Sequence, residues 1–168
     1  MSLIKKLKGD GAALPPKPAT RSILFAWIGG FLAISAVALL DDALSSVLVL
    51  GSFGASCVLV FGFPHLPFSQ PRNVVCGHVL SSLIGLACLT LLGSQWWAMA
   101  IAVGTAIAFM MLTRTVHPPA GSNPVIVFLT APTWEFLVFP TLAGALIIVL
   151  IALIYNNMAH DDRYPKYW

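Results

Sequence analysis

RTVHPPAGSNP, residues 114–124, is a polar, proline-rich stretch that stands between two hydrophobic runs. Pro118 and Pro119 have no backbone N–H, so a continuous α-helix cannot pass through them without losing hydrogen bonds. The residue before a proline is pushed toward extended conformations, so we expect a helix to end at His117. In a membrane, such a broken backbone is tolerated only where protein or a water-filled cavity surrounds it. The stretch therefore predicts a ligand or ion site between membrane helices.

The composition of the 168-residue chain is that of an integral membrane protein. Hydrophobic residues make up 58% of it and charged residues 9%, whereas soluble domains have roughly 25% charged residues. No polar segment is long enough for a separate soluble domain. We therefore predict one transmembrane domain, residues 22–157, between a basic tail (1–21) and a polar tail (158–168). The three cysteines lie in apolar runs without CxxC spacing, which is typical of packing rather than of a disulfide or metal site.

Five hydrophobic runs each approach the roughly 20 residues that cross a hydrocarbon core. The runs are residues 23–40, 43–63, 73–92, 96–112 and 136–155. We favour a retained helix over a signal peptide for the first run. The predicted fold is an all-α, compact bundle of about five transmembrane helices, with four or six as the alternatives. Residues 125–130 are too short to span, and predict either a re-entrant half-helix or a lead into the last helix.

The placement of Lys and Arg predicts the orientation of the helices. The first tail holds five cations, and the only cationic loops between the runs contain Arg72 and Arg114. These segments are therefore expected in the cytoplasm, and the expected membrane is a bacterial inner (plasma) membrane. Five spans then place the C-terminus on the opposite side from the N-terminus.

An internal repeat is visible at an offset of fifty residues, where Gly54 aligns with Gly104 and Asn73 with Asn123. Each copy has a helix with small residues followed by a proline-rich loop. The first proline loop is PHLPFSQPRN (residues 64–73) and the second proline loop is RTVHPPAGSN (residues 114–123). We predict two parallel helix–loop–helix repeats, of about residues 43–92 and 96–155, as some transporters have.

The interior is predicted to carry a positive bias. From Ala43 to Trp134 the sequence contains no Asp or Glu, yet the same span holds Arg72 and Arg114. Ionisable groups in a bilayer usually face the bundle interior or an aqueous path. Without a carboxylate to pair with, the arginines favour an anionic ligand. The alternative is that both arginines are anchors that extend to the cytoplasmic interface.

The proline loops also resemble helix starts, because Ser and Asn are preferred N-caps and Pro suits a first helical turn. A helix N-terminus offers free N–H donors and a partial positive charge to an anion. We expect two such starts to converge beside Arg72 and His117. His78 has two interpretations, a hydrogen bond to a neighbouring helix or a place along the path. The predicted substrate-binding residues are Gln70, Arg72, Asn73, His78, Arg114, His117, Ser122 and Asn123.

Enzymatic and metal sites are not expected. No nucleophile is paired with an oriented base, and no phosphate-binding glycine loop occurs. The histidines lack acidic partners and close spacing, so we predict no metal site and no cofactor.

Two segments carry a family resemblance. HPPAG, residues 117–121, resembles the signature that gives the HPP family of integral membrane proteins its name, and SQPRNVVCGH, residues 69–78, resembles its second marked segment. The resemblance extends over roughly residues 25–155. It implies a compact membrane domain, usually described with four helices, and a role in nitrite transport for some cyanobacterial and plastid relatives.

These observations together predict a transporter or channel for a small inorganic anion, with nitrite as the leading candidate. We expect a homo-oligomer, most simply a dimer, in the lipid bilayer, and no nucleic-acid partner. One alternative is a non-transporting scaffold or lipid-binding subunit. Another is a transporter in which His117 relays protons.

Overall fold

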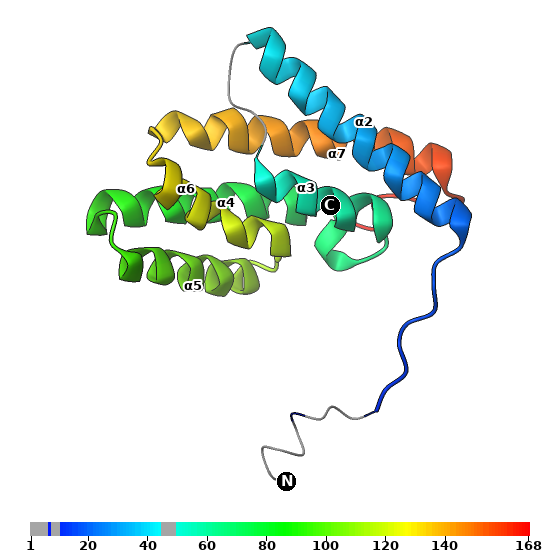
Figure 1. Cartoon of the computed structure of the whole chain (residues 1–168), viewed down its shortest axis with the longest axis horizontal. Coiled ribbons are helices and arrows are strands. Elements are labelled where there is room, and N and C mark those ends of the chain that lie inside the picture. Colours follow the sequence, from blue (N-terminus) through cyan, green and yellow to red (C-terminus); the bar gives the residue numbers. More distant parts are fainter. Residues whose placement is uncertain (1–6, 8–10, 45–49) are drawn as a thin grey trace.

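The computed structural model describes residue 7, residues 11–44 and residues 50–168. Within this part the fold is entirely helical, as predicted, and contains no β-strand (Figure 1). The α-helices are α2 (Thr20–Leu44), α3 (Gly51–Gly62), α4 (Pro71–Leu92), α5 (Trp96–Leu112), α6 (Asn123–Thr130) and α7 (Ala143–Ala159). Short 3₁₀ turns are η1 (Pro67–Ser69), η2 (Pro118–Ser122) and η3 (Trp134–Leu137), and a π-helical turn, η4 (Val138–Leu142), leads into α7.

Three of the five predicted runs form helices long and apolar enough to cross a membrane: 20–43, 71–92 and 134–159. α5 has 17 residues and α3 only 12, and 12 residues rise about 18 Å. Residues 45–49 of the second predicted run, like Lys5, Lys6 and Lys8 of the first tail, lie outside the described residues. These helices agree with the predicted integral membrane class, and the number of full-length spans stays a prediction.

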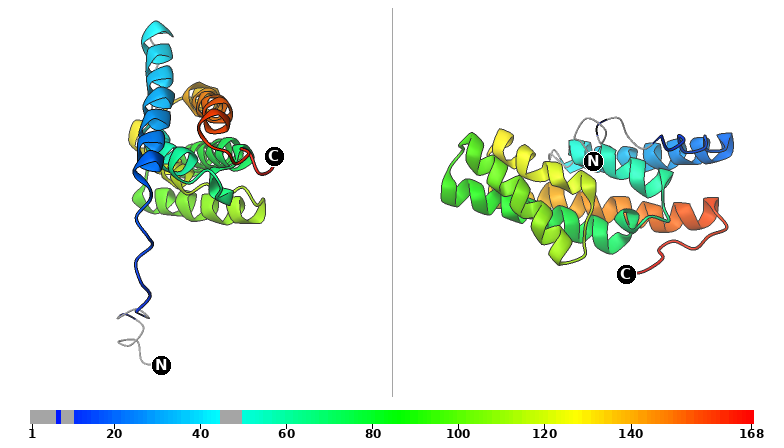
Figure 2. Two further views of the ribbon diagram at one scale, coloured as in Figure 1. Left: turned by 90° about the vertical axis from the view of Figure 1, so that its right-hand side faces the viewer. Right: turned by 90° about the horizontal axis from the view of Figure 1, so that it is seen from below.

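The helices run back and forth between two ends of an elongated bundle (Figures 1 and 2). One end, here called the cationic end, holds the start of α2, the end of α7, both proline loops and the C-terminal tail. The opposite end, here called the far end, holds the starts of α3 and η3 and the end of α6. α6 leads away from the cationic end, and the segment from η3 to α7 returns to it.

This path corrects the predicted position of the C-terminus. The Tyr164 hydroxyl donates a hydrogen bond to the Ser69 carbonyl, and the Lys166 backbone N–H donates one to Gln70 Oε1. The tail therefore lies against the first proline loop, on the same side as the start of α2. The prediction of opposite sides was wrong because it counted one passage between the second proline loop and the C-terminus, whereas the chain leads to the far end through α6 and returns through α7.

The second proline loop interrupts the helix as predicted, although α5 already ends at Leu112 rather than at His117. Arg114 has φ 56°, in the left-handed region, and its N–H bonds to the Met111 carbonyl. The Thr115 N–H bonds to the Met110 carbonyl. These two bonds are the Schellman pattern of a helix C-terminus, which uses up carbonyls that the helix leaves free. His117 then follows in an extended conformation, with φ −133° and ψ 99°.

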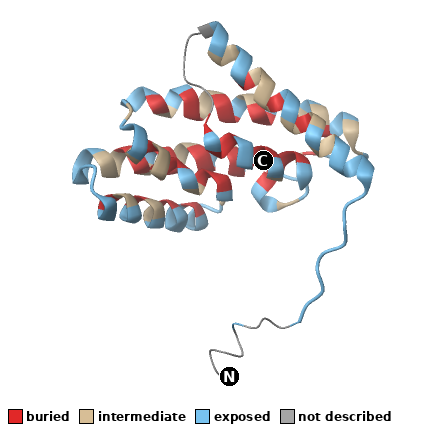
Figure 3. Ribbon diagram, viewed as in Figure 1, coloured by how far each residue is buried: buried red, intermediate tan, exposed pale blue. Residues whose placement is uncertain are grey.

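Small residues of α4 let the second proline loop and α6 approach closely. A Cβ added at Gly77 would lie 2.8 Å from His117 Cβ, and one added at Gly85 would lie 2.9 Å from Pro124 Cα. Glycine is the residue that permits such contact between backbones. The buried sides of the helices face one another around this contact (Figure 3).

The internal repeat stays a prediction, but the two segments assigned to it follow similar paths. α3, the first proline loop and α4 run to the cationic end and back, and α5, the second proline loop and α6 do likewise. The return helix of the second copy is α6, with 8 residues, rather than the predicted helix that ends at Tyr155. Gly54 and Gly104 have no other atom within 4 Å of an added Cβ, so neither marks a close contact inside the chain.

Candidate functional site

Two buried histidines meet at one serine in the centre of the bundle. Ser56 Oγ of α3 lies 2.9 Å from His78 Nε2 and 2.8 Å from His117 Nε2. All three side chains have 0% exposure. The ring centroids are 5.0 Å apart, with an angle of 62° between the ring planes. α3, α4 and the second proline loop thus each contribute one group.

Further polar side chains continue this cluster on both sides. Asn123 Nδ2 lies 3.1 Å from His78 Nδ1 and 2.9 Å from Ser82 Oγ, and Ser82 Oγ lies 3.0 Å from Thr141 Oγ1. On the other side, His117 Nδ1 lies 2.6 Å from the Phe68 carbonyl. These six side chains are here called the polar chain: Thr141, Ser82, Asn123, His78, Ser56 and His117.

The polar chain is stable only as a connected unit. A polar group without a partner in an apolar medium costs several kcal/mol, so each member depends on its neighbours. Gly77 and the break at Pro118 bring His117 close enough to join it. The interpretation of His78 as a hydrogen-bonding residue is therefore correct, and the bonds reach two elements, α3 and α6.

Two of the predicted site residues, Gln70 and Asn73, form hydrogen bonds to backbone carbonyls of the proline loops. The Gln70 side chain donates to the Pro64 and Leu66 carbonyls, each at 2.9 Å. Asn73 Nδ2 donates at 2.9 Å to the Val116 carbonyl, next to His117. Both amides are buried, so they shape the two proline loops around the polar chain.

Arg72, Arg114 and Ser122 lie on the surface. Arg72 Nη2 donates at 3.1 Å to the Thr113 carbonyl, which places it beside the end of α5. Ser122 Oγ donates to the Pro119 carbonyl at 2.8 Å. The structure thus brings three of the eight predicted residues together, namely His78, His117 and Asn123.

The predicted convergence of two capped helix starts is wrong. α4 and α6 both begin with a proline in the first turn, but neither has a side-chain cap. Pro124 packs on Gly85, about four turns along α4 from its start. The two helix starts are separated along α4, because Asn123 at the start of α6 lies beside His78 and Ser82, about two to three turns from Pro71.

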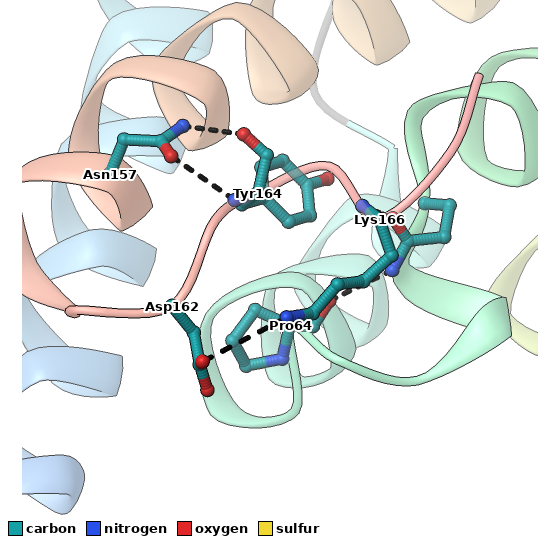
Figure 4. A network of polar contacts seen from close by, with 6 residues as sticks. Pro64, Asn157, Asp162, Tyr164 and Lys166 are labelled. Carbon is teal, nitrogen blue, oxygen red and sulfur yellow. Dashed lines mark hydrogen bonds and ion pairs between the residues drawn. The ribbon is translucent and has the colours of Figure 1, made fainter.

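The C-terminal tail covers the first proline loop (Figure 4). Asn157 donates to the Tyr164 carbonyl and accepts from its N–H, and Lys166 reaches Asp162 at 3.9 Å. The Tyr164 hydroxyl then bonds to the Ser69 carbonyl at 2.7 Å. The pKa of this buried phenol is raised, because burial disfavours the phenolate. The tail therefore hydrogen-bonds to the first proline loop, whose Phe68 carbonyl accepts a hydrogen bond from His117.

Sequence reasoning missed Ser56, Ser82 and Thr141 as members of a polar site. Ser56 lies in the hydrophobic run 43–63, within the small-residue helix of the first predicted repeat. A hydroxyl inside an apolar run was the only available signal, and its partners lie 22 and 61 residues away. Which hydroxyls meet the histidines depends on helix packing, which the sequence pattern does not specify.

Two hollows flank the cationic end. A cavity of about 310 Å³ lies between the start of α2, the first proline loop and the tail. An apolar groove of about 490 Å³ lies along α4, with Arg72 and Thr113 at one end and Leu142 also lining it. A larger hollow of about 970 Å³ opens at the far end, beside Glu135.

Comparison with known proteins agrees with this membrane architecture. The family model described as HPP, transmembrane region, matches residues 15–165. A transmembrane protein of Dictyostelium discoideum is 38% identical over 178 residues, which cover 98% of this chain and 62% of the relative. A second transmembrane protein from the same organism is 36% identical over 176 residues, which cover 98% of this chain and 56% of the relative. The chain thus spans about three fifths of the length of these relatives. No solved structure matches it.

Proposed function

Because the chain belongs to the HPP family of transmembrane proteins, we propose that it carries a small inorganic anion across the membrane, with nitrite as the first candidate. The observation that carries the proposal is the distribution of charge. The described Lys and Arg residues gather at the cationic end, where both proline loops lie, and Ala43 to Trp134 contains no carboxylate. Asp161 and Asp162 of the tail lie at the same end, but the six described Lys and Arg residues outnumber them. An excess of one sign raises the local concentration of the opposite ion.

Arg72 is the proposed first contact for the anion. Its guanidinium has five N–H donors, and the one that bonds to the Thr113 carbonyl leaves others for an oxyanion. Charge-assisted bonds of this kind are roughly twice as strong as neutral ones. Arg114 follows Thr113 directly and adds a second cation to the same place.

The polar chain is the proposed interior part of the path. It supplies imidazole, hydroxyl and amide groups to the centre of the bundle. These groups would exchange their mutual hydrogen bonds for bonds to the anion, in place of its hydration shell. We keep a homo-oligomer, most simply a dimer, as part of the proposal, because a small bundle must enclose a path and still present an apolar exterior.

A flux assay with purified protein in lipid vesicles tests the proposal. Nitrite, nitrate, chloride and formate are offered in turn, with protein-free vesicles as the background. We expect Arg72→Ala to lose nitrite flux while membrane insertion is retained. Arg21→Ala is the matched control, since Arg21 is an exposed cation at the same end whose guanidinium lies 5.0 Å from the Phe25 ring centroid. Unchanged nitrite uptake by Arg72→Ala removes Arg72 from the mechanism.

A lipid-binding subunit without transport is the second candidate, favoured by the groove along α4. An acyl chain fits the apolar lining of Val75, Val79 and Leu83, and Arg72 at its end can hold a lipid phosphate. Under this alternative no anion is transported, and anionic lipid copurifies with the wild type but not with Arg72→Ala.

The expectation of a bacterial plasma membrane stays a prediction, because both relatives come from Dictyostelium discoideum.

A further inference from the structure

The hydrogen bonds between the two histidines have a defined direction. His117 Nδ1 faces the Phe68 carbonyl at 2.6 Å, and a carbonyl only accepts, so Nδ1 carries the hydrogen. In the neutral ring His117 Nε2 is then an acceptor. It lies 2.8 Å from Ser56 Oγ, so the serine hydroxyl donates to it.

The orientation of Asn123 fixes the second ring. Asn123 Nδ2 lies 3.3 Å from the His78 carbonyl as well as 3.1 Å from His78 Nδ1. An amide nitrogen beside a carbonyl donates, so His78 Nδ1 accepts and neutral His78 carries its hydrogen on Nε2. That hydrogen points at Ser56 Oγ, 2.9 Å away. The sequence Asn123 to His78 to Ser56 to His117 to the Phe68 carbonyl is therefore donor to acceptor at every step.

One atom of this arrangement has no partner. Asn123 Oδ1 is buried and makes no hydrogen bond among the described residues. A half-turn of the amide would exchange Oδ1 and Nδ2, and Oδ1 would then accept a hydrogen from His78 Nδ1. The amide would give up its 3.3 Å bond to the His78 carbonyl in this state. Ser82 tolerates the exchange, because its hydroxyl can donate or accept toward Thr141. Asn123 can thus face His78 in two protonation states.

We infer that His78, Ser56 and His117 form a proton relay inside the bundle, with the Asn123 amide turning to let His78 take up the proton. In the transfer, imidazolium His78 gives its Nε2 proton to Ser56 Oγ while Ser56 gives its hydroxyl proton to His117 Nε2. One N–H and one O–H bond break, one of each forms, and the charge moves to His117. Ser56 remains a neutral hydroxyl. The proton leaves from His117 Nδ1, beside the first proline loop. Rotation of the two rings and of the Ser56 hydroxyl then restores the original arrangement of hydrogen bonds.

The surroundings leave the relay without a competing base. Titratable groups on the elements packed against it are Arg21, Asp41 and Asp42 of α2, Cys57 of α3, Arg72, Cys76 and Cys88 of α4, Arg114 after α5, Glu135 of η3 and Tyr155 of α7. Those beside the first proline loop are His65, Asp162, Arg163, Tyr164, Lys166 and Tyr167. None of the four carboxylates in this set of described residues is buried: Asp41 is half-buried, and Asp42, Glu135 and Asp162 are exposed. A proton inside the bundle is therefore held by the imidazoles.

The relay rests on the proposed anion transport, because we infer that each anion crosses together with a proton. A proton on either imidazole gives the anion a cationic partner in the interior, and both cross together. The Ser56 hydroxyl can also turn to the Ser52 carbonyl at 3.0 Å, which interrupts the relay between transfers.

Ser56→Ala and Ser52→Ala form a matched pair of variants. Both serines are buried on α3, but Ser52 Oγ has no hydrogen-bond partner among the described residues. The experiment measures nitrite uptake and internal acidification separately, in vesicles that contain a pH-sensitive dye. Protein-free vesicles give the background from diffusion of neutral nitrous acid. We expect acidification above background for the wild type and Ser52→Ala, and a loss of about tenfold or more for Ser56→Ala.

The outcomes separate the relay from the transport proposal. Nitrite uptake without acidification above background, or acidification that Ser56→Ala leaves unchanged, overturns the relay and leaves anion transport standing. Proton movement under an imposed pH gradient that depends on Ser56, with no uptake of any anion, overturns the transport proposal and supports the relay. Absence of both overturns both.

A second pair of variants protects the test against misfolding. Ser56→Thr keeps the hydroxyl, whereas Ser56→Cys replaces it with a weak donor and acceptor. The relay predicts that the threonine variant retains acidification and the cysteine variant loses it, although both insert into the membrane. Equal acidification by the two contradicts the relay.

Discussion

His117 Nδ1 of the second proline loop lies 2.6 Å from the Phe68 carbonyl of the first, 49 residues earlier in the chain. Asn73 makes the reciprocal link, from the first loop to the Val116 carbonyl of the second, at 2.9 Å. The two loops are thus bonded to each other directly above the polar chain. The conformation of both proline loops and the geometry of the histidine site therefore depend on the same contacts.

Replacing His117 should lower stability measurably. His117→Ala leaves the Phe68 carbonyl and Ser56 Oγ without this partner, and a buried group left unsatisfied costs about 1–3 kcal/mol. His117→Asn retains a donor near the position of Nδ1, so we expect it to recover part of the loss. Thermal unfolding in detergent measures both. His65→Ala is the control, because His65 is exposed in the first proline loop. Equal midpoints for His117→Ala and His65→Ala contradict the prediction.

Gly77→Ala should displace the second proline loop from α4. The new Cβ would lie 2.8 Å from His117 Cβ and 3.1 Å from the Thr115 carbonyl oxygen. Overpacking of this kind costs about 1–3 kcal/mol, so we expect a lower unfolding midpoint and, under the transport proposal, reduced flux. Gly104→Ala is the control on α5, since nothing lies within 4 Å of its added Cβ. An unfolding midpoint for Gly77→Ala at or above that of Gly104→Ala would disprove the close contact.

The Tyr164 hydroxyl should stabilise the tail in a pH-dependent way. Burial raises the pKa of this phenol above its ordinary value near 10, so the folded protein holds the proton more tightly than the unfolded chain. The stabilisation is complete below about pH 10 and is lost as the pH rises through the folded pKa. We expect Tyr164→Phe to lower the unfolding midpoint at pH 8, and the difference from the wild type to shrink above pH 10. Tyr167→Phe, at an exposed tyrosine, should have a smaller effect. A difference that grows above pH 10 argues against burial of the phenol.

The local features of the fold were predictable because they depend on nearby residues. The break at Pro118 and Pro119 follows from two missing N–H groups, and close packing at Gly77 and Gly85 follows from their missing side chains. The hydrophobic run 96–112 matches α5, but the helix end expected at His117 lies five residues too late. A Schellman turn with Arg at a left-handed position has no strong sequence signal. Left-handed residues at helix ends are usually Gly or Asn.

The site was only partly predictable, because it joins residues from distant segments. His117 and Asn123 were found since they lie in the polar stretch itself, and His78 since it is a titratable residue in an apolar run. Ser56 was missed because its role depends on which face of α3 meets α4. Arg72 was predicted as a substrate-binding residue, which stays a prediction, and the sequence does not show that its side chain lies outside the polar chain.

The shared position of the two ends of the chain gives a direct test of the architecture. Because Tyr164 and Lys166 contact the first proline loop, residues before α2 and after α7 should lie on one side of the membrane. Single cysteines are introduced at Ala19, Asp162, Ser94 and Thr133 in a variant in which Cys57, Cys76 and Cys88 are serine. A membrane-impermeant maleimide should label Ala19→Cys and Asp162→Cys from one side, and Ser94→Cys and Thr133→Cys from the other. Labelling of Ala19→Cys and Asp162→Cys from opposite sides would restore an odd number of crossings, and would separate the tail from the loop that holds His117.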